Sequence, residues 1–422
     1  MKRIGMSILS LALLLCLAAC GNTNPAASGT AAPETAVPET AAPQEDYDGK
    51  LVLDGPMELE YARNFAVDRY KGGYRMFTAG TTGNTYLVVP EGMSVPEELE
   101  AGVVVLQQPI DRVYLASTGM TSLVAAMGGL DHVKLVANDV EDWYIEDVVA
   151  KMNEGSIAFS GHYKEPDYEQ MTANDIQLHV DTTMIDNNPE VLEKFDELGI
   201  PSIVENSSKE AHPLGRVEWV KLFGVLFGME EQAEAYFEAQ KALVEDATAA
   251  QAYGKTVAMG YITSTDKCYA RNGGDYMAQL IGMAGGTYIL ADMEPEKSGN
   301  TNMTFEEWYA GNKDADYLFY VNFARSFASI QEMIDYNPLF ADFKAVQDGN
   351  VWITSPDFTQ STAAIASILS DMNAILASAD GCPVRAQTHV SRPRGRGYTR
   401  PSPPPTAGRV LPPAAGVALR TA

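Results

Sequence analysis

Runs in which apolar and polar residues alternate dominate the chain between residues 51 and 110. Thr85–Val89 and Val103–Leu106 are rich in β-branched side chains, and Met57–Phe65 alternates more loosely. Runs of roughly four to eight such residues, separated by glycine-containing turns, are typical of β-strands. We therefore expect a β-rich segment over 51–110.

Between residues 111 and 210, short apolar runs alternate with amphipathic segments. A strand at Arg112–Leu115 leads into a helix at Met120–Met127, and a second strand follows at Val133–Ala137. Strand, helix and strand at this spacing form a βαβ unit of a parallel sheet. The alternation continues with helices at Tyr168–Asn174 and Pro189–Leu198 and with strands at Ile176–Val180 and Pro201–Val204.

The longest helical stretch runs from His212 to Tyr253. Its apolar residues recur at intervals of three and four, which is typical of an amphipathic helix. Gly224 and Gly228 are positions for a kink or for close packing, and Gly254 is placed to end the helix.

Strands and helices alternate again after Gly254. We expect strands at Thr256–Tyr261, Tyr288–Leu290, Tyr317–Val321 and Val351–Thr354, and helices at Asp275–Met283, Phe305–Tyr309, Ile330–Ile334, Leu339–Ala345 and Ser361–Ala379. Pro166–Val180 and Met303–Val321 read alike, each an acidic helix start followed by a buried strand. The sequence thus predicts an α/β fold with two similar, Rossmann-like lobes and a single long backbone helix joining them.

The N-terminus has the features of an export signal. Lys2 and Arg3 precede the apolar run Met6–Ala19, which is too short to span a membrane as a permanent helix. The run leads into Leu17-Ala-Ala-Cys20-Gly, which resembles the lipobox of bacterial lipoproteins, where the Cys is lipid-modified and becomes the first residue. We expect Cys20 to carry acyl chains such as palmitate and to anchor the chain on the extracytoplasmic side of the cell membrane. A plain secretory signal is the alternative.

Two further segments have compositions that do not favour folding. Residues 21–50 are rich in Ala, Pro and Thr, which indicates a flexible linker. Residues 381–422 hold seven Arg and eight Pro without Lys, Asp or Glu, and we expect a disordered tail, either translated out of frame or a genuine basic extension. The predicted division is a signal peptide (1–20), a linker (21–50), an N-terminal lobe (51–210) with an added β-rich segment (51–110), a bridging helix region (211–253), a C-terminal lobe (254–380) and the tail (381–422).

The overall charge narrows the classes of partner. The chain has 30 basic and 56 acidic residues, a formal net charge of −26, and its basic residues are enriched at the two ends. An acidic body repels phosphate backbones, which excludes nucleic acid as a partner. Four Cys in 422 residues also exclude a disulfide-rich scaffold.

A series of short motifs carries a resemblance to a known family. They are Asp111-Arg-Val…Ser117-Thr-Gly-Met-Thr, Pro166-Asp-Tyr-Glu…Ile176-Gln-Leu, Leu198-Gly-Ile-Pro, Leu280-Ile-Gly-Met-Ala-Gly-Gly, Thr304-Phe-Glu-Glu…Asp316 and Phe343-Lys-Ala-Val-Gln-Asp-Gly-Asn-Val. In this order they resemble the substrate-binding lipoproteins of ABC importers for iron complexes, heme and cobalamin, over residues 111–380. Asn174-Asp175 departs from the family's usual Pro-Asp, and residues 51–110 lie outside its pattern.

The resemblance implies a monomeric binding protein rather than an enzyme. It would capture a small-molecule metal chelate, here a ferric siderophore, and deliver it to the transmembrane subunits of an ABC permease. Cobalamin or another corrinoid, and then heme, are the alternative ligands, and no resident cofactor is expected. In the family one Glu on each lobe docks the permease; by position these are Glu169 and Glu306, with Glu307 as an alternate. The same acids also fit solvated helix starts favoured by the helix dipole.

The resemblance also implies a ligand cleft between the two lobes, with the ligand near the strand ends and the loops that follow them. The candidate contacts are Ser117, Thr118, Trp143, Tyr144, His162, Tyr163, Tyr269, Arg271 and Arg325. Aromatic rings suit a flat or macrocyclic ligand, and the two Arg suit its anionic oxygens. Since the chain has 20 Tyr, each aromatic residue fits ordinary packing as well. His162 with Tyr163 is the strongest pair, followed by Arg325.

The two alternative functions are binding of a bare metal ion and enzymatic catalysis. A Zn or Mn site needs three or four converging His or carboxylate ligands, and the body offers His132, His162, His179 and His212. The nucleophile-elbow, phosphate-loop and H-E-x-x-H motifs are missing, and Cys268 and Cys382 are isolated in the sequence. An exported hydrolase would need a nucleophile and a base that meet in the cleft.

Overall fold

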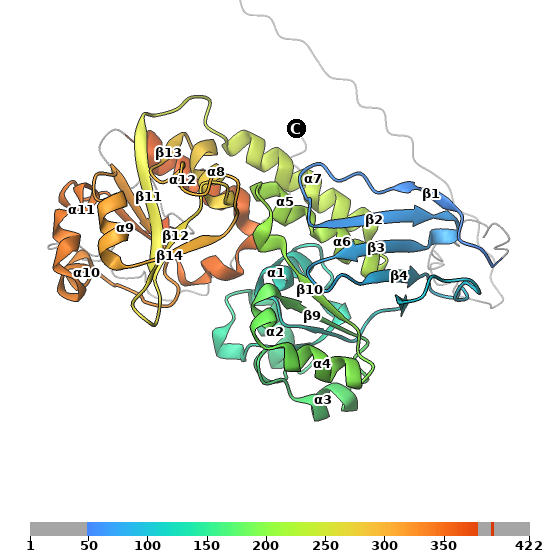
Figure 1. Cartoon of the computed structure of the whole chain (residues 1–422). Coiled ribbons are helices and arrows are strands. Elements are labelled where there is room, and N and C mark those ends of the chain that lie inside the picture. Colours follow the sequence, from blue (N-terminus) through green and yellow to red (C-terminus); the bar gives the residue numbers. More distant parts are fainter. Residues whose placement is uncertain (1–48, 379–389, 392–422) are drawn as a thin grey trace, which may run out of the picture. The chain divides into compact units, whose positions relative to one another are not determined.

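Three β-sheets, formed one after another along the chain, are the framework of the computed structural model, which describes residues 49–378 and 390–391 (Figure 1). The lipidation candidate Cys20, nearly all of the predicted linker and most of the predicted tail lie outside the described residues. Among the described helices, none combines the length and the apolar character that crossing a membrane requires.

The first sheet has five strands in the order β1-β2-β3-β4-β5. They are β1 (Leu53–Pro56), β2 (Phe65–Tyr70), β3 (Arg75–Ala79), β4 (Thr85–Val89) and β5 (Val103–Gln107). Neighbouring strands are antiparallel except β4 and β5, which are parallel. The strands expected at 85–89 and 103–106 are confirmed.

The segment Met57–Phe65, expected as a strand, is a loop between β1 and β2. It is joined to β2 at its two ends, since the Met57 N–H donates to the Val67 carbonyl at 2.7 Å and Phe65 is the first residue of β2. The backbone N–H groups of residues 60–62 donate to the Glu218 carboxylate at 2.8 to 2.9 Å, and those of residues 63–64 donate to Glu210 at 2.9 and 3.0 Å. Since side-chain carboxylates already satisfy these donors, a neighbouring strand cannot use them.

The second sheet is fully parallel, in the order β10-β9-β6-β7-β8. Its strands are β6 (Val113–Leu115), β7 (Val133–Val136), β8 (Ala158–Phe159), β9 (Leu178–Thr182) and β10 (Ser202–Glu205). The helices between them are α1 (Thr118–Ala126), α2 (Glu146–Glu154), α3 (Tyr168–Ala173) and α4 (Pro189–Glu197). The alternation predicted from the sequence is confirmed for the other elements, whose boundaries shift by a few residues, whereas α2 and β8 were not expected.

The linking region contains three helices where the sequence predicts one. They are α5 (Pro213–Glu218), α6 (Val220–Phe227) and α7 (Glu230–Ala247). Gly228 ends α6 with a left-handed φ of 69°, a conformation that glycine adopts without a steric penalty. The prediction of a single long helix is therefore wrong: Gly228 separates α6 from α7 instead of kinking the helix, and a second break at Trp219 separates α5 from α6.

The third sheet is mixed, in the order β14-β12-β11-β15-β16-β17, with β13 paired to β11. Its strands are β11 (Lys255–Ile262), β12 (Cys268–Arg271), β13 (Gly286–Tyr288), β14 (Asn300–Met303), β15 (Tyr317–Tyr320), β16 (Val351–Thr354) and β17 (Val390–Ser391). Its helices are α8 (Tyr276–Met283), α9 (Phe305–Asn312), α10 (Ile330–Tyr336), α11 (Lys344–Gln347) and α12 (Ile365–Ala377). The antiparallel strands β12 and β14 were not expected from the sequence.

Part of the predicted tail joins this sheet. Strand β17 pairs antiparallel with β16, so that Ile353 lies opposite Ser391 and Thr354 opposite Val390. At these two positions the tail is a strand rather than the unstructured chain expected from its composition.

One hydrophobic core connects the three sheets. It runs without interruption from Phe77 in β3, through Trp219 and Phe237 in the linking region, to Leu376 in α12. Helix α7 packs against both α6 and α12. The linking helices therefore belong to the core and position residues from both halves of the chain.

Candidate ligand-binding site

A short segment of the C-terminal half lies against the parallel sheet of the N-terminal half. It consists of the 3-10 turns η7 (Pro356–Gln360) and η8 (Thr362–Ala364). The Gln360 amide donates to the Asp142 carbonyl at 2.7 Å and accepts from the Tyr144 N–H at 2.9 Å. The Ala363 N–H donates to Ser122 in α1 at 3.2 Å. The two halves therefore meet at the carboxyl ends of β6 and β7, where parallel α/β sheets hold their ligands.

Ser117 begins α1 and is only 1% exposed. Its hydroxyl accepts from the N–H of Met120 at 3.3 Å and donates to the buried Glu205 carboxylate at 2.9 Å. These are the contacts of an N-cap. Thr118, the next residue, is partly exposed at the N-terminus of the helix.

Trp143 and Tyr144 have opposite environments. Trp143 is buried in the core, and its indole N–H donates to the Asn138 carbonyl at 3.1 Å. Tyr144 is 53% exposed. Of this predicted pair, Tyr144 is the side chain that a ligand can reach in this conformation.

His162 and Tyr163 lie on the loop that follows β8. His162 is exposed and meets Phe159 edge-on, with ring centres 5.8 Å apart. Tyr163 packs against the core under α3 and α4, and Nζ of Lys164 lies 5.5 Å from its ring centre. The described ring contacts of this pair stay within its own half of the chain.

Tyr269 and Arg271 alternate along β12 and point to the same side of the strand. The Tyr269 ring contacts Tyr261 in β11, whose ring also meets the exposed Phe323 edge-on. Burial raises the pKa of Tyr261 to about 12, and the positive charge of Arg271 partly offsets this rise. An aromatic group and a guanidinium are therefore neighbours at this end of the third sheet.

Arg216 joins the same group, although sequence reasoning missed it. It lies in α5, and its Cζ is 4.4 Å from the centre of the Tyr276 ring, while Cζ of Arg271 is 5.8 Å from that ring centre. Nη2 of Arg216 donates to Thr362 in η8 at 3.3 Å. A position in the last turn of a short helix of the linking region gives no sequence signal for such a contact.

Arg325 stands apart from this group because it already has a carboxylate partner. Its Nη2 lies 2.6 Å from Asp266, and its guanidinium stacks 4.5 Å above the Tyr336 ring. The Tyr336 hydroxyl also donates to Asp266, at 2.9 Å. The three side chains join the β11–β12 turn to the segment after β15.

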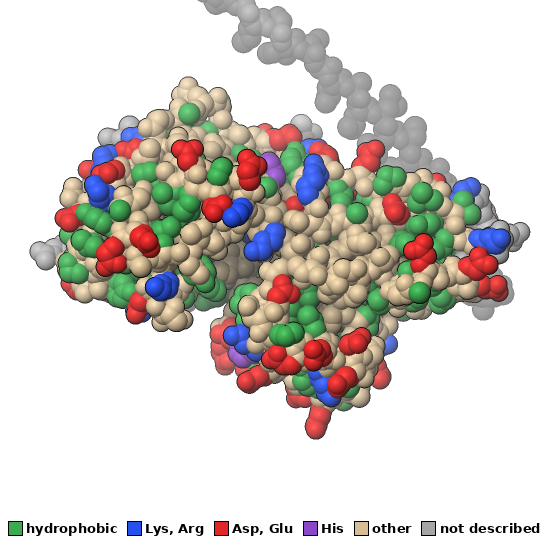
Figure 2. All heavy atoms as spheres, in the orientation of Figure 1, with side chains coloured by type: hydrophobic (Ala, Val, Ile, Leu, Met, Phe, Trp, Pro, Cys, Tyr) green, Lys and Arg blue, Asp and Glu red, His purple; other side chains and the backbone are tan. Residues whose placement is uncertain are grey.

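Glu169 and Glu306 are both exposed in the first turns of α3 and α9. Glu169 borders a cavity of about 470 Å³ with Tyr168, Thr172, Ala173 and Leu198. Figure 2 shows that acidic side chains gather on the surface over α3 and α4.

Glu307, the predicted alternate to Glu306, has a local role. Its carboxylate accepts from the N–H and hydroxyl of Thr304 at 2.8 and 2.9 Å, which completes a capping box. These hydrogen bonds lower the pKa of Glu307.

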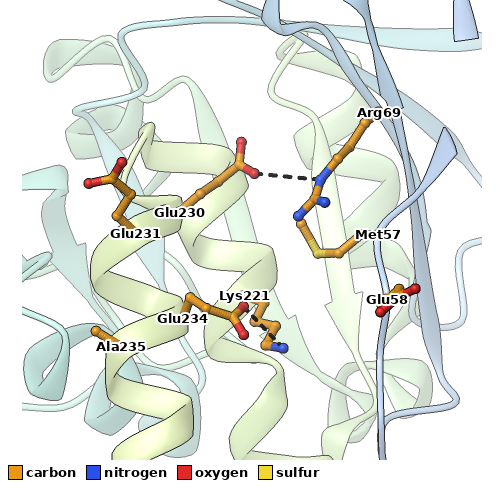
Figure 3. A pocket seen from close by; sticks show the side chains of 8 residues that line it. All are labelled: Met57, Glu58, Arg69, Lys221, Glu230, Glu231, Glu234 and Ala235. Carbon is orange, nitrogen blue, oxygen red and sulfur yellow. Dashed lines mark ion pairs between the residues drawn. The ribbon is translucent and has the colours of Figure 1, made fainter. Parts of the chain in front are cut away.

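A larger cavity, of about 720 Å³, lies between the first sheet and helices α6 and α7 (Figure 3). One ion pair crosses it, Arg69 in β2 with Glu230 in α7 at 4.0 Å, and a second joins Lys221 in α6 to Glu234 in α7 at 3.1 Å on the helical side. None of the residues predicted to bind the ligand lines it. Four of its charged side chains are therefore already paired with one another.

Two groups that a hydrolase could use are both buried in the described structure. A serine, a histidine and a carboxylate do meet, since His179 lies 3.0 Å from the Ser202 hydroxyl and 3.4 Å from Asp181. His179, however, has no exposed surface, so a substrate cannot reach it. Burial raises the pKa of Cys268 to about 12, which makes its thiol a poor nucleophile. Within residues 49–378, no group of three or more His, Cys, Asp or Glu is placed to hold a metal ion.

The chain is similar in sequence to a known protein family and to a lipoprotein. Residues 114–358 match the family described as periplasmic binding protein. An uncharacterized lipoprotein of Methanocaldococcus jannaschii is 28% identical over 332 residues, which cover 72% of this chain and 77% of that protein.

Two solved structures resemble the chain in fold. A possible iron-binding (periplasmic solute-binding) protein from Staphylococcus epidermidis has a TM-score of 0.51 at 17% identity, covering 64% of this chain and 99% of that one. A periplasmic heme-binding protein from Pseudomonas aeruginosa has a TM-score of 0.51 at 15% identity, covering 68% and 99%. These matches confirm the predicted α/β class with parallel sheets.

Proposed function

Because this chain belongs to the periplasmic binding protein family, we propose that it is the extracytoplasmic substrate-binding lipoprotein of an ABC importer. The family match over residues 114–358 is the observation that carries the proposal. The lipobox-like sequence around Cys20 supports the lipid anchor, as does the description of the Methanocaldococcus jannaschii relative as a lipoprotein.

The proposed ligand is an iron complex of the ferric siderophore type, which the protein binds as a monomer. The description of the Staphylococcus epidermidis protein as a possible iron-binding protein supports this class. Heme is the second candidate, favoured by the description of the Pseudomonas aeruginosa protein.

The proposed contacts are the side chains that are accessible at the ends of the two sheets. Tyr144 and Thr118 come from the N-terminal half, and Tyr269 and Arg271 from the C-terminal half. Ser117 and Trp143 are buried and support this surface from beneath. His162, Tyr163 and Arg325 remain predicted contacts that would require a ligand large enough to extend beyond this group.

Delivery requires a membrane partner. We propose that Glu169 and Glu306, exposed on different halves of the chain, dock against basic side chains of the permease. Two such contacts orient the binding protein on the transporter and favour its association.

A thermal-shift screen of the purified full-length protein tests the proposed function. The probes are ferric siderophores, heme, cyanocobalamin and free metal ions. A ligand at 100 times its Kd adds about 2.7 kcal/mol to the free energy of unfolding. We expect a rise in Tm with one of the chelates and none with free metal ions. A rise with free metal ions alone, or with no probe, would refute chelate capture.

A further inference from the structure

Two guanidinium groups from distant parts of the chain meet at one tyrosine ring. Arg216 comes from α5 in the linking region and Arg271 from β12 in the third sheet. Their Cζ atoms lie 4.4 and 5.8 Å from the centre of the Tyr276 ring, which is itself buried. Two like charges beside a low-dielectric ring repel each other unless an anion lies between or beside them.

The protein does not neutralise Arg216. Its described hydrogen bond goes to the neutral hydroxyl of Thr362, at 3.3 Å. Among residues 49–378, no carboxylate oxygen lies within ion-pair distance of it, and its Nε has no hydrogen-bond partner. Within the described part of the chain, this guanidinium therefore has a buried Nε without a partner and one hydrogen bond.

Among the described residues, Arg271, unlike Arg216, has a carboxylate within ion-pair distance. Its Nη1 lies 3.7 Å from Asp275, beyond hydrogen-bond distance, and in the described structure its Nε has no partner either. Asp275 is already used, because it accepts from the N–H of Met277 at 3.0 Å and from the N–H of Gly299 at 2.8 Å. Asp275 thus caps α8 and holds a loop, and it only partly balances the charge of Arg271.

The N-terminal half of the chain also lies close to the Arg216 guanidinium. A Cβ added to Gly119, in the first turn of α1, would lie 3.9 Å from Nη2 of Arg216. The first N–H groups of a helix lack intrahelical partners and favour negative charge. An anion beside Arg216 would therefore contact groups from both halves.

We propose that Arg216 and Arg271 together form a subsite for an oxyanion carried by the ligand, a carboxylate, a phosphate or an inorganic oxyanion. A planar guanidinium binds such an oxyanion through two parallel N–H donors. Two guanidiniums beside the same tyrosine ring can contact the oxyanion from two directions. The adjoining rings of Tyr261 and Tyr269 offer an apolar surface for the rest of the ligand. The inference rests on the proposed function, since it assigns the chemistry by which that binding protein selects its ligand.

The test compares anionic with neutral probes on the full-length protein by isothermal titration. The probes are a ferric tris-catecholate, which is anionic, a neutral ferric tris-hydroxamate, and phosphate, sulfate and molybdate. The variants are Arg216→Met and Arg271→Met, which remove the guanidinium but keep an unbranched apolar stem, and Arg112→Met is the matched control. Arg112 is a partly exposed Arg that pairs with Asp111, outside the subsite.

We expect the protein to bind the catecholate complex or one of the inorganic oxyanions, and each subsite variant to lose at least tenfold in affinity while Arg112→Met loses none. Arg216→Lys and Arg271→Lys, which keep the charge without the planar fork, should retain intermediate affinity and serve if a Met variant does not fold.

The possible results of this titration distinguish failure of the oxyanion subsite from failure of chelate capture. If both Arg→Met variants bind the chelate with unchanged affinity, the oxyanion subsite is overturned, but the proposed function as a chelate-binding protein stands. Binding of an inorganic oxyanion alone, lost in the variants, would support the subsite and refute chelate capture. No binding of any anionic probe would overturn the subsite.

Discussion

The Glu218 carboxylate accepts a hydrogen bond of 2.8 Å from the backbone N–H of Tyr61, a residue 157 positions earlier in the chain. It also accepts from the N–H groups of Glu60 and Ala62, and Nζ of Lys221 lies 3.3 Å away. Glu218 has no exposed surface. This one buried carboxylate therefore fastens the first sheet to the linking helices.

Glu218→Ala should destabilise the protein strongly. The substitution leaves three backbone donors unpaired and Lys221 without its buried partner, and loss of one member of a buried ion pair costs about 3–5 kcal/mol. Urea unfolding followed by circular dichroism measures the change. The control is Glu234→Ala, which removes the half-exposed partner of Lys221 and should cost about 1 kcal/mol or less. Equal losses of unfolding free energy in the two variants would contradict the role of Glu218 in fastening the first sheet to the linking helices.

Asp316 should make stability depend on pH in the acid range. Burial alone would raise the pKa of Asp316, but hydrogen bonds from Lys344 and from the N–H and hydroxyl of Thr256 hold it below its ordinary value of 3.8. A carboxyl whose pKa is lower in the folded state stabilises the protein above its unfolded pKa. This stabilisation is lost as the pH falls through the folded pKa.

Asp316→Asn should therefore cost about 1–3 kcal/mol near neutral pH, and the difference from the unsubstituted protein should shrink as the pH falls below about 4. Urea unfolding at several pH values measures both quantities. Asp314→Asn, at an exposed neighbouring carboxylate that pairs with Lys313, is the control and should show neither effect. A difference that stays constant with pH would argue against the assigned hydrogen bonds.

Cys268 should resist thiol reagents in the folded protein. Burial raises the pKa of its thiol to about 12, and the side chain is 1% exposed. Labelling with a chromogenic disulfide should therefore give one more thiol in guanidinium than under native conditions, because only unfolding exposes it. In Cys268→Ala this extra thiol should be absent. Rapid native labelling that Cys268→Ala abolishes would show that the site is open.

Glu169 and Glu306 should affect transport without affecting binding. Charge reversal in Glu169→Lys and Glu306→Lys should lower uptake of the chelate by cells at least several-fold, since like charges at a docking surface repel each other. Ligand affinity measured on the purified variants should not change. Glu193→Lys, on the exposed face of α4, is the control and should transport normally. Normal uptake by both docking variants would exclude these residues from docking.

Local signals made most of the fold predictable. Ser117 before an apolar run and the glycine pair after it bracket α1, and β-branched runs mark β4 and β5. Strand β14 escaped detection because Asn300-Thr-Asn lacks an apolar alternation and acquires its structure by pairing with β12. The Met57–Phe65 loop looked like a strand because its true hydrogen-bond partners, Glu210 and Glu218, lie far away in sequence.

The site was less predictable, because the charge state of a residue depends on its neighbours in space. The sequence favours Arg325 over Arg271 as a ligand contact, yet Arg325 pairs with Asp266, which lies 59 positions earlier in the chain. Arg216 was missed, since its contact with Tyr276 is formed only when α5 packs beside α8. The sequence indicates candidate residue types for a ligand site but not which of these side chains keep unpaired donors.

Equilibrium dialysis against a ferric chelate, with radioactive iron and a separately labelled chelator, tests the central claim most directly. If the protein captures an intact iron complex, it should retain iron and chelator in equal amounts, saturating at one complex per protein. Retention of iron without the chelator, or of neither, would contradict that claim.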